Sequence, residues 1–250
     1  MKKTILGLML FVASLGATEI YATFNIDAKK SANLAFYSSG IVAKVFVDIS
    51  DNVKKGQKLV ELQNDDLKAS LKIAKATLDN AKISLKYAKK AHDRQLRIKD
   101  LIDEAEFDKY VFTYESASVA LASAKANLAY KQSLLDRTFI KAPFDGVIFE
   151  KSVEVGDVVS GMMLRTVFKI QSKKDRKLIL EFDQKYWKKV KVGNIVKYTV
   201  NGDKKTYNGK ISKIYPFANS KNRKLKAEVK AQGFIVGLFG DGYIIVPDDK

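Results

Sequence analysis

A stretch of chain without glycine or proline, residues 65–139, constrains the fold more than any other feature of the sequence. Apolar or small residues recur along its first half at alternating intervals of four and three. They are Leu67, Leu71, Ala74, Leu78, Ala81, Leu85 and Ala88. Such a heptad stripe is typical of a helix that packs along its length against another helix. The lack of Gly and Pro removes the usual causes of a kink, so we expect a stiff, straight element.

The second half of this stretch carries a matching stripe, interrupted where Lys131 takes an apolar position. Its members are Phe107, Tyr110, Tyr114, Ala117, Leu121, Ala124, Leu128 and Leu135. Between the stripes, Asp103 and Glu106 have the spacing of a capping box, so the first helix is expected to end near Leu101 and the second to begin at once. A connection this short makes the helices antiparallel, and about 35 residues at 1.5 Å each give an arm on the order of 50 Å long.

An internal repeat flanks this predicted helical hairpin. Residues 40–47 followed by 51–56 resemble residues 146–153 followed by 157–161. Each copy places Gly before an apolar strand and returns through a turn that begins with Asp and ends with Gly. Two related β hairpins of this kind predict a pseudo-symmetric sandwich with the helical hairpin inserted between its halves.

The rest of the chain favours a small β-barrel. Val196, Tyr198 and Val200 alternate with polar residues and lead into Asn201 and Gly202, a strong signal for a two-residue hairpin turn. Several short strands separated by turns are typical of a barrel. An alternating strand near the N-terminus, residues 20–26, is expected to contribute to the same domain.

The N-terminus has the layout of a secretory signal. Lys2 and Lys3 precede an apolar run at residues 5–15, followed by the small residues Gly16 and Ala17. The run is short for a bilayer span, so cleavage near Gly16 or Ala17 is expected, with a retained anchor as the alternative. The net charge of +17 suggests an anionic partner, but export argues against nucleic acid. The chain has no cysteine, which excludes disulfides and thiolate metal sites.

The order of these parts resembles a known family. The repeat, the inserted coiled coil and the run Thr-Phe-Ile-Lys-Ala-Pro-Phe-Asp-Gly at residues 138–146 are similar to the membrane fusion proteins, the HlyD-like periplasmic adaptors of tripartite efflux pumps and type I secretion. The later segments at residues 209–216 and 222–224 resemble the barrel of that family. Nearly all of the mature chain is covered by the resemblance.

The resemblance implies an α+β fold, with a split lipoyl-like β-sandwich interrupted by a long antiparallel α-helical coiled-coil hairpin and followed by a small β-barrel. The expected domains are a signal peptide at 1–17, a strand at 18–34 that contributes to the barrel, lipoyl-like halves at 35–63 and 138–171, the hairpin at 64–137 and the barrel at 172–250. Few residues follow the last barrel strand, so a minimal adaptor is expected, one that contacts the pump chiefly through the barrel.

The implied function is that of a periplasmic adaptor in a Gram-negative bacterium, free in the periplasm or peripherally attached to the inner membrane. Its implied partners are an inner-membrane transporter, an outer-membrane channel and further copies of itself in a trimeric or hexameric ring. The transporter is expected to be a resistance-nodulation-division pump, with an ABC transporter as the alternative. Another class of function also fits the charge: a basic periplasmic protein that binds anionic lipid or cell-wall polymer.

The hairpin tip holds the candidate docking residues. Adaptors of resistance-nodulation-division pumps often carry Arg, Leu and Ser at fixed spacing there. In this chain Leu96 and Asp103 stand at the Leu-to-Ser spacing, the Arg position is His92, and Arg94 and Arg97 lie close by. Packing in the seam is the other interpretation of Leu96, and helix capping that of Asp103. The lysines of the first helix are interpreted either as a solvated surface or as partners for acidic helices.

Residues for catalysis or cofactor binding are not evident. The single histidine, His92, lies in a heptad position, and the glycines of residues 233–242 do not form a nucleotide-binding motif. Met162 and Met163 alone do not make a site for a soft metal. A lipoyl or biotinyl carrier would need a modifiable lysine on the turn that joins the two halves, where the hairpin stands instead. We therefore expect no enzymatic activity, no cofactor and no metal.

Overall fold

The computed structural model describes residues 17–163 and 165–247, which form two compact units. One unit contains residues up to Ser31 together with those from Gln171 onward, and the other contains residues 32–170. Neither of the long helices in the described ranges is apolar enough along its length to cross a membrane.

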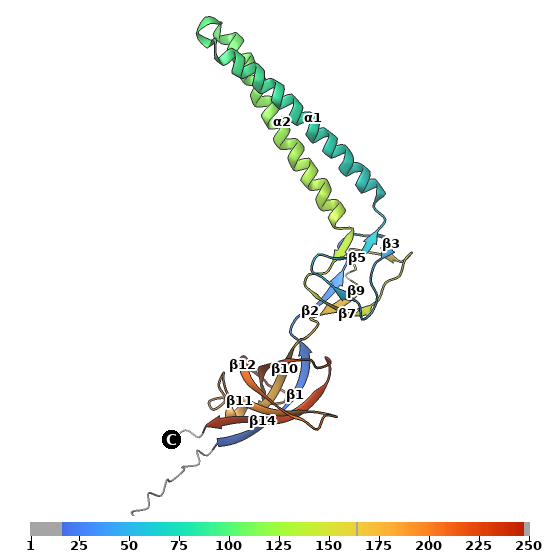
Figure 1. Cartoon of the computed structure of the whole chain (residues 1–250), viewed down its shortest axis with the longest axis vertical. Coiled ribbons are helices and arrows are strands. Elements are labelled where there is room, and N and C mark those ends of the chain that lie inside the picture. The colour runs from blue at the N-terminus through green and yellow to red at the C-terminus, as the bar shows by residue number, and fades with distance from the viewer. Residues whose placement is uncertain (1–16, 164, 248–250) are drawn as a thin grey trace, which may run out of the picture. The chain divides into compact units, whose positions relative to one another are not determined.

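The first unit is a closed antiparallel barrel with the strand order β1-β10-β13-β12-β11-β14 (Figure 1). Its strands are β1 (Ala17–Ala28), β10 (Asp175–Asp183), β11 (Ile195–Val200), β12 (Thr206–Asn219), β13 (Lys224–Gln232) and β14 (Phe239–Pro247), with a 3-10 turn, η2 (Gln184–Tyr186), after β10. Alternate residues such as Ile20, Phe24, Leu178 and Phe182 are buried in the barrel core, as the period of two predicts. The barrel closes through β1 and β14, where Ala17 pairs with Pro247.

Gly240 lets two strands of the barrel approach closely. A Cβ atom at this position would lie 2.1 Å from the carbonyl oxygen of Thr199 on β11 and 2.7 Å from the ring of Phe24. Only a residue without a side chain fits between β14 and β11 here.

The second unit contains a sandwich of two four-stranded sheets, ordered β2-β9-β7-β4 and β6-β5-β3-β8. Its strands are β2 (Ser31–Ala35), β3 (Gly40–Val45), β4 (Asn52–Val53), β5 (Lys58–Leu62), β6 (Phe139–Lys141), β7 (Gly146–Lys151), β8 (Val158–Val159) and β9 (Thr166–Gln171). The core between the sheets includes Leu59, Leu62, Ile148, Phe168 and Ile170.

The two copies of the sequence repeat exchange strands in this sandwich. The strand β3 of the first copy pairs with β8 of the second, and β7 of the second pairs with β4 of the first. The turns are equivalent as well, because Asp51 accepts a hydrogen bond from the backbone of Asp48 (2.7 Å) just as Asp157 accepts one from that of Glu154 (3.0 Å). Neither copy completes its sheet alone, which explains why the repeat spans the inserted hairpin.

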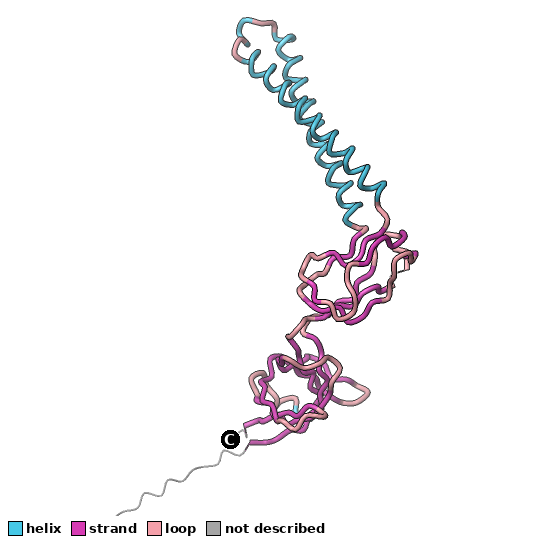
Figure 2. The backbone as a smooth tube through the Cα atoms, turned by 45° about the vertical axis from the view of Figure 1, so that its right-hand side comes forward, coloured by secondary structure: helices cyan, strands magenta, loops and turns pink. Residues whose placement is uncertain are grey.

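The hairpin leaves the sandwich after β5 and returns at β6 as two long helices that run side by side (Figure 2). They are α1 (Asp65–Leu96) and α2 (Glu104–Asp136), joined by a short 3-10 turn, η1 (Lys99–Leu101). The predicted end of the first helix near Leu101 is therefore about one turn too late. The chain needs these residues to reverse direction, because the N-cap Asp103 must be extended (φ −63°, ψ 139°) for its carboxylate to accept from the N–H of Ala105 (2.9 Å).

Candidate functional site

The two helices meet along the predicted seam, whose residues are buried or half-buried. At the base of the hairpin, the Asn64 amide donates a hydrogen bond to the hydroxyl of Thr138 (2.8 Å). Near the tip, the ring of His92 stacks on Tyr114 (centroids 5.1 Å apart) and lies beside Phe107 (5.8 Å). The residue numbers add up to 202 for the contact at the base and to 206 and 199 for the two contacts near the tip, so residues with a sum near 202 lie at about the same height on the hairpin.

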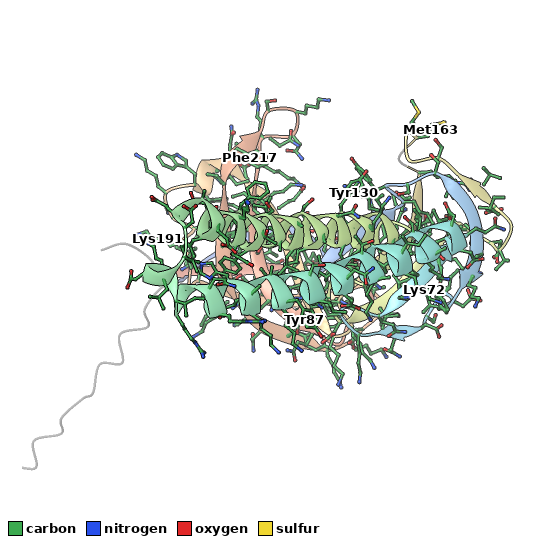
Figure 3. The ribbon with its side chains drawn as sticks, turned by 90° about the horizontal axis from the view of Figure 1, so that it is seen from above. Lys72, Tyr87, Tyr130, Met163, Lys191 and Phe217 are labelled. Carbon is green, nitrogen blue, oxygen red and sulfur yellow. The ribbon has the colours of Figure 1, made fainter. Side chains whose placement is uncertain are left out.

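Each helix also carries a second stripe, mostly of apolar or small residues, on the side away from its partner. These outer stripes consist of Ala69, Ile73, Ala76, Asn80, Ile83 and Tyr87 on α1, and of Phe112, Ser116, Val119, Ser123, Ala126 and Tyr130 on α2. Every member follows a seam residue by two positions, which places it nearly opposite the seam. In Figure 3, Tyr87 projects from α1 away from α2, and Tyr130 projects from α2 away from α1.

The large side chains of the outer stripes are exposed to an unusual degree. The exposed fraction is 69% for Ile73, 55% for Ile83, 72% for Phe112 and 69% for Val119. A row of exposed apolar residues at heptad spacing is more than the scattered apolar residues that ordinary surfaces show. The hairpin therefore presents an exposed, largely apolar row on each of its two outer sides.

The remaining two sides of the hairpin differ in charge. The residues directly after Leu67, Ala74, Ala81 and Ala88 of the seam form a lysine face: Lys68, Lys75, Lys82 and Lys89. A neutral face on the opposite side is formed by residues directly before the other, alternate seam positions: Ser70, Thr77, Ser84 and Ala91 on α1, and Thr113, Ala120 and Asn127 on α2. On the lysine face, Lys82 pairs with Asp79 (2.9 Å) and Lys68 with Glu61 (3.0 Å).

The structure gives the predicted docking residues at the tip different environments. Arg94, Leu96 and Arg97 are exposed at the end of α1, with Leu96 at 51%. Leu96 is therefore not buried in the seam. His92 packs inside the seam, and Asp103 caps α2.

Sequence analysis missed two residues at the tip and the outer stripes. Ile98 and Leu101 are 41% and 84% exposed, so together with Leu96 they form an apolar tip. The sequence indicated them by placing two large apolar residues in the connection between the helices, where no residue of the seam can cover them. The outer stripes could have been found from their own spacing of four and three, two positions after the seam.

Comparison with known proteins identifies the family to which this architecture belongs. A family model described as the CzcB-like barrel-sandwich hybrid domain matches residues 30–171. Comparison with curated protein sequences finds no significant match.

Solved structures share the fold over nearly the whole chain. MacA from Actinobacillus actinomycetemcomitans is 21% identical, with a TM-score of 0.75 over 94% of this chain and 81% of that one. A MacA-MexA chimera with the α-hairpin of Pseudomonas aeruginosa MexA is 22% identical, with a TM-score of 0.70 over 93% and 83%. The membrane fusion protein Spr0693 from Streptococcus pneumoniae R6 is 19% identical, with a TM-score of 0.68 over 92% and 100%. The predicted fold class is thus confirmed, and the chain belongs to the CzcB-like barrel-sandwich hybrid family, with the fold of the membrane fusion proteins.

Proposed function

We propose that this protein is the adaptor of an export assembly, in which several copies form a ring and their hairpins pack side by side into a tube. The tube would link an inner-membrane transporter to an outer-membrane channel, and the adaptor itself would perform no chemistry. The family and the fold support this role. The observation that carries it is the pair of outer stripes, since an isolated hairpin has no use for two further packing surfaces.

The outer stripes are complementary in a ring. When copies are related by rotation about an axis parallel to the hairpin, α1 of one copy meets α2 of the next at the same height. The sum of about 202 then brings Ile83 to Val119 and Ile73 to Tyr130, while Ala76 meets Ala126. In these three pairs small residues face small ones and large residues face large ones, as close helix packing favours, whereas Tyr87 meets Ser116.

The position of the outer stripes also bears on the number of copies. Each outer-stripe residue follows a seam residue by two positions, and at 3.5 residues per turn this is a rotation of about 206° about the helix axis. Measured the shorter way round the helix, the seam and the outer stripe are therefore about 154° apart. This angle is smaller than the 180° of a flat row of helices, so the row bends at each helix. Because the two helices are antiparallel, the bend is toward the same side of the hairpin at both. An angle of about 150–155° at each helix closes a tube of about twelve to fourteen helices, or six to seven hairpins. This supports a hexameric ring over a trimeric one.

The bend has a consequence for the inside of the tube. It points toward the neutral face, so the lumen would be lined by Ser70, Thr77, Ser84, Thr113 and Asn127, with the lysine face outside. Hydroxyl and amide groups offer weak, general contacts to a passing solute. A strongly basic lining would instead retain anionic solutes.

Cysteine pairs test the ring directly, because the natural chain has no cysteine. Ile83→Cys with Val119→Cys is expected to form disulfides between copies, giving a ladder of covalent oligomers. Within one copy the two positions lie on opposite outer sides, about 13 Å apart between Cα atoms for helix axes 8–10 Å apart, too far for a disulfide. Six or seven rungs in the ladder would match the geometry.

A matched control changes only the height. Ile73→Cys with Val119→Cys keeps both cysteines on outer stripes but separates them by ten residues, about 15 Å along the helix. This pair should remain largely uncrosslinked. Equal cross-linking of both pairs, or none in either, would contradict the side-by-side ring.

At the tip, we propose that Arg94, Leu96 and Arg97, together with Ile98 and Leu101, contact the outer-membrane channel. His92 and Asp103 would hold the tip in shape, since one packs in the seam and the other caps α2. Charge reversal of Arg94 and Arg97 together should abolish export while the disulfide ladder from the outer-stripe cysteine pair persists. Unchanged export would rule out docking through these arginines.

The periplasm is the compartment that this role requires, and the predicted secretory signal supports it, although that segment lies outside the described residues apart from Ala17. A resistance-nodulation-division pump remains the proposed transporter, with an ABC transporter as the alternative. Co-purification of the transporter with the intact ring would distinguish the two.

A further inference from the structure

An exposed aromatic surface lies at one end of the barrel. Trp187 and Phe217 are 64% and 59% exposed, and Pro216 and Leu225 lie with them along a groove of about 490 Å³. We call these four residues the aromatic end patch. Phe217 stands on the long hairpin of β12 and β13 (Figure 3). Exposed aromatic groups of this size are costly in water unless something covers them.

The barrel holds the aromatic end patch in a defined position. The Asp183 carboxylate caps η2 by accepting from the N–H of Lys185 (2.9 Å). The N–H of Gln184 donates to the carbonyl of Arg223 (3.0 Å), which fixes η2 against the β12–β13 turn, and that of Trp187 donates to the Gln184 carbonyl (3.0 Å). The aromatic groups therefore come from two ordered elements rather than from a loose loop.

The patch lies at the barrel end where the chain enters. Ala22 of β1 pairs with Phe182 of β10, and Asp183 pairs with Lys224, so the start of β1, the end of β10 and the β12–β13 turn share one end. Residues 1–16, with the apolar run at 5–15, join the barrel at this end.

Positive charge surrounds the aromatic groups. The cations on η2 and its continuation and on the β12–β13 turn are Lys185, Lys188, Lys189, Lys221 and Arg223, all exposed. The ammonium of Lys188 lies 5.3 Å from the centre of the Trp187 ring. Asp183, the acid of η2's N-cap among the described residues, is engaged in the cap of η2 and in a 4.0 Å contact with Lys185.

This combination is characteristic of the boundary between a bilayer and water. Trp and Phe insert among the lipid headgroups, while lysines keep their ammonium groups at the level of anionic phosphates. The core of a protein interface, by contrast, is depleted in lysine. A polyanion in solution would bind the lysines without covering Trp187 and Phe217.

We propose that the aromatic end patch and its surrounding cations bind the surface of an anionic lipid bilayer. This goes beyond the proposed adaptor function, because a single copy carries the complete surface and no ring is needed. The barrel would thereby be oriented on the membrane that holds the transporter.

Trp187 is the only tryptophan of the chain and reports on the patch directly. The full chain is titrated with vesicles of phosphatidylcholine alone or mixed with phosphatidylglycerol, and the tryptophan emission is recorded. Anionic vesicles should shift the emission to the blue, brominated acyl chains should quench it, and salt should reverse both effects. Residues 1–16 contain no tryptophan, so binding through the leader alone leaves the emission unchanged and overturns the proposal.

A matched reporter examines the opposite end of the barrel. Phe239 is 57% exposed at the start of β14, far from the patch, and Trp187→Phe with Phe239→Trp moves the single tryptophan there. Its emission should not shift with anionic vesicles. An equal shift at both ends would mean that the barrel adsorbs without a specific face, and would overturn the proposal.

Charge variants supply the second control. Lys188→Gln with Lys189→Gln should weaken vesicle binding roughly thirtyfold, from about a fivefold loss per cation near an anionic surface. Lys173→Gln with Lys174→Gln removes the same charge at the far end, several Debye lengths away, and should change nothing. Equal effects of both pairs would contradict the assigned face.

Two further outcomes would overturn the proposal by identifying another occupant. A blue shift that appears with rising protein concentration and no lipid would indicate a second copy on the patch. A shift with soluble polyglutamate that vesicles fail to reproduce would indicate a polyanion instead.

Discussion

The hydrogen bond between Asn64 and Thr138 joins the two ends of the hairpin where it meets the sandwich, and its removal should destabilise the arm. Both residues are almost completely buried, at 2% and 4% exposure. The Thr138 hydroxyl accepts from the Asn64 amide (2.8 Å) and donates to the carbonyl of Leu135 (2.6 Å) at the end of α2. The same hydroxyl thus ties the first residue before α1 to the last turn of α2.

Thr138→Val replaces the hydroxyl by a methyl group of the same shape. The Leu135 carbonyl keeps the backbone N–H of Thr138 as a donor (3.0 Å), but one N–H of Asn64 is left buried without a partner. An unsatisfied buried donor costs about 1–3 kcal/mol, so we expect the free energy of unfolding to fall by about 2 kcal/mol. Because the methyl group retains the packing, no cavity adds to this loss.

Thr113→Val is the matched control. Its hydroxyl donates to the carbonyl of Lys109 (2.7 Å) on the exposed side of α2, where water can replace it. The expected change is within about 0.5 kcal/mol. Urea unfolding followed by circular dichroism at 222 nm measures both variants, because α1 and α2 supply nearly all helical signal of the described residues. A loss for Thr138→Val no larger than that for Thr113→Val would refute the reasoning.

Two further predictions concern the barrel. The hydrogen bond from the Tyr215 hydroxyl to Glu228 (2.7 Å), followed by burial, raises the pKa of Tyr215 to about 12, so its contribution to stability is complete below about pH 10 and is lost as the pH rises toward 12. Unfolding followed by tryptophan emission at pH 9 and pH 11 should show this loss, and Tyr215→Phe should reduce it. Gly240→Ala should destabilise the barrel by about 3 kcal/mol or more, at or beyond the upper end of the usual cost of overpacking, because its Cβ would meet the Thr199 carbonyl oxygen, a backbone atom. Gly202→Ala, at φ +87° with open space around it, should cost only about 1–2 kcal/mol of backbone strain; equal losses would contradict the steric explanation.

The hairpin could be predicted from sequence because its information is local. Leu71 and Leu78 lie on one face of a helix whatever the rest of the chain does, and the cap at Asp103 marks where the second helix begins. The end of α1 at Leu96 was harder to predict from the sequence, because the position of a chain reversal depends on both helices at once. The repeat predicted the sandwich for a similar reason, as its two copies are visible in the sequence before any pairing is known.

What sequence analysis could not give depends on contacts between distant residues. The pairing of Ala17 with Pro247 closes the barrel across almost the whole length of the chain, and no local pattern encodes it. Trp187 and Phe217 likewise come together only because Asp183 and Lys224 are paired neighbours on β10 and β13. The outer stripes are a different case. Their spacing can be recognised in the sequence, but only their exposure in the structure shows that they do not pack between α1 and α2.

The distribution of lysines gives the net charge of +17 a more specific meaning than a general affinity for anions. On the hairpin, lysines follow the seam at Lys75 and Lys82, while Ser70, Thr77 and Ser84 occupy the opposite side. If the neutral side lines a tube, the charge of the hairpin acts outside the path of the exported solute. On the barrel, lysines surround Trp187, where a bilayer would be met. The charge would thus lie outside the tube on the hairpin and against the bilayer on the barrel, so selection among solutes would fall to the transporter rather than to this protein.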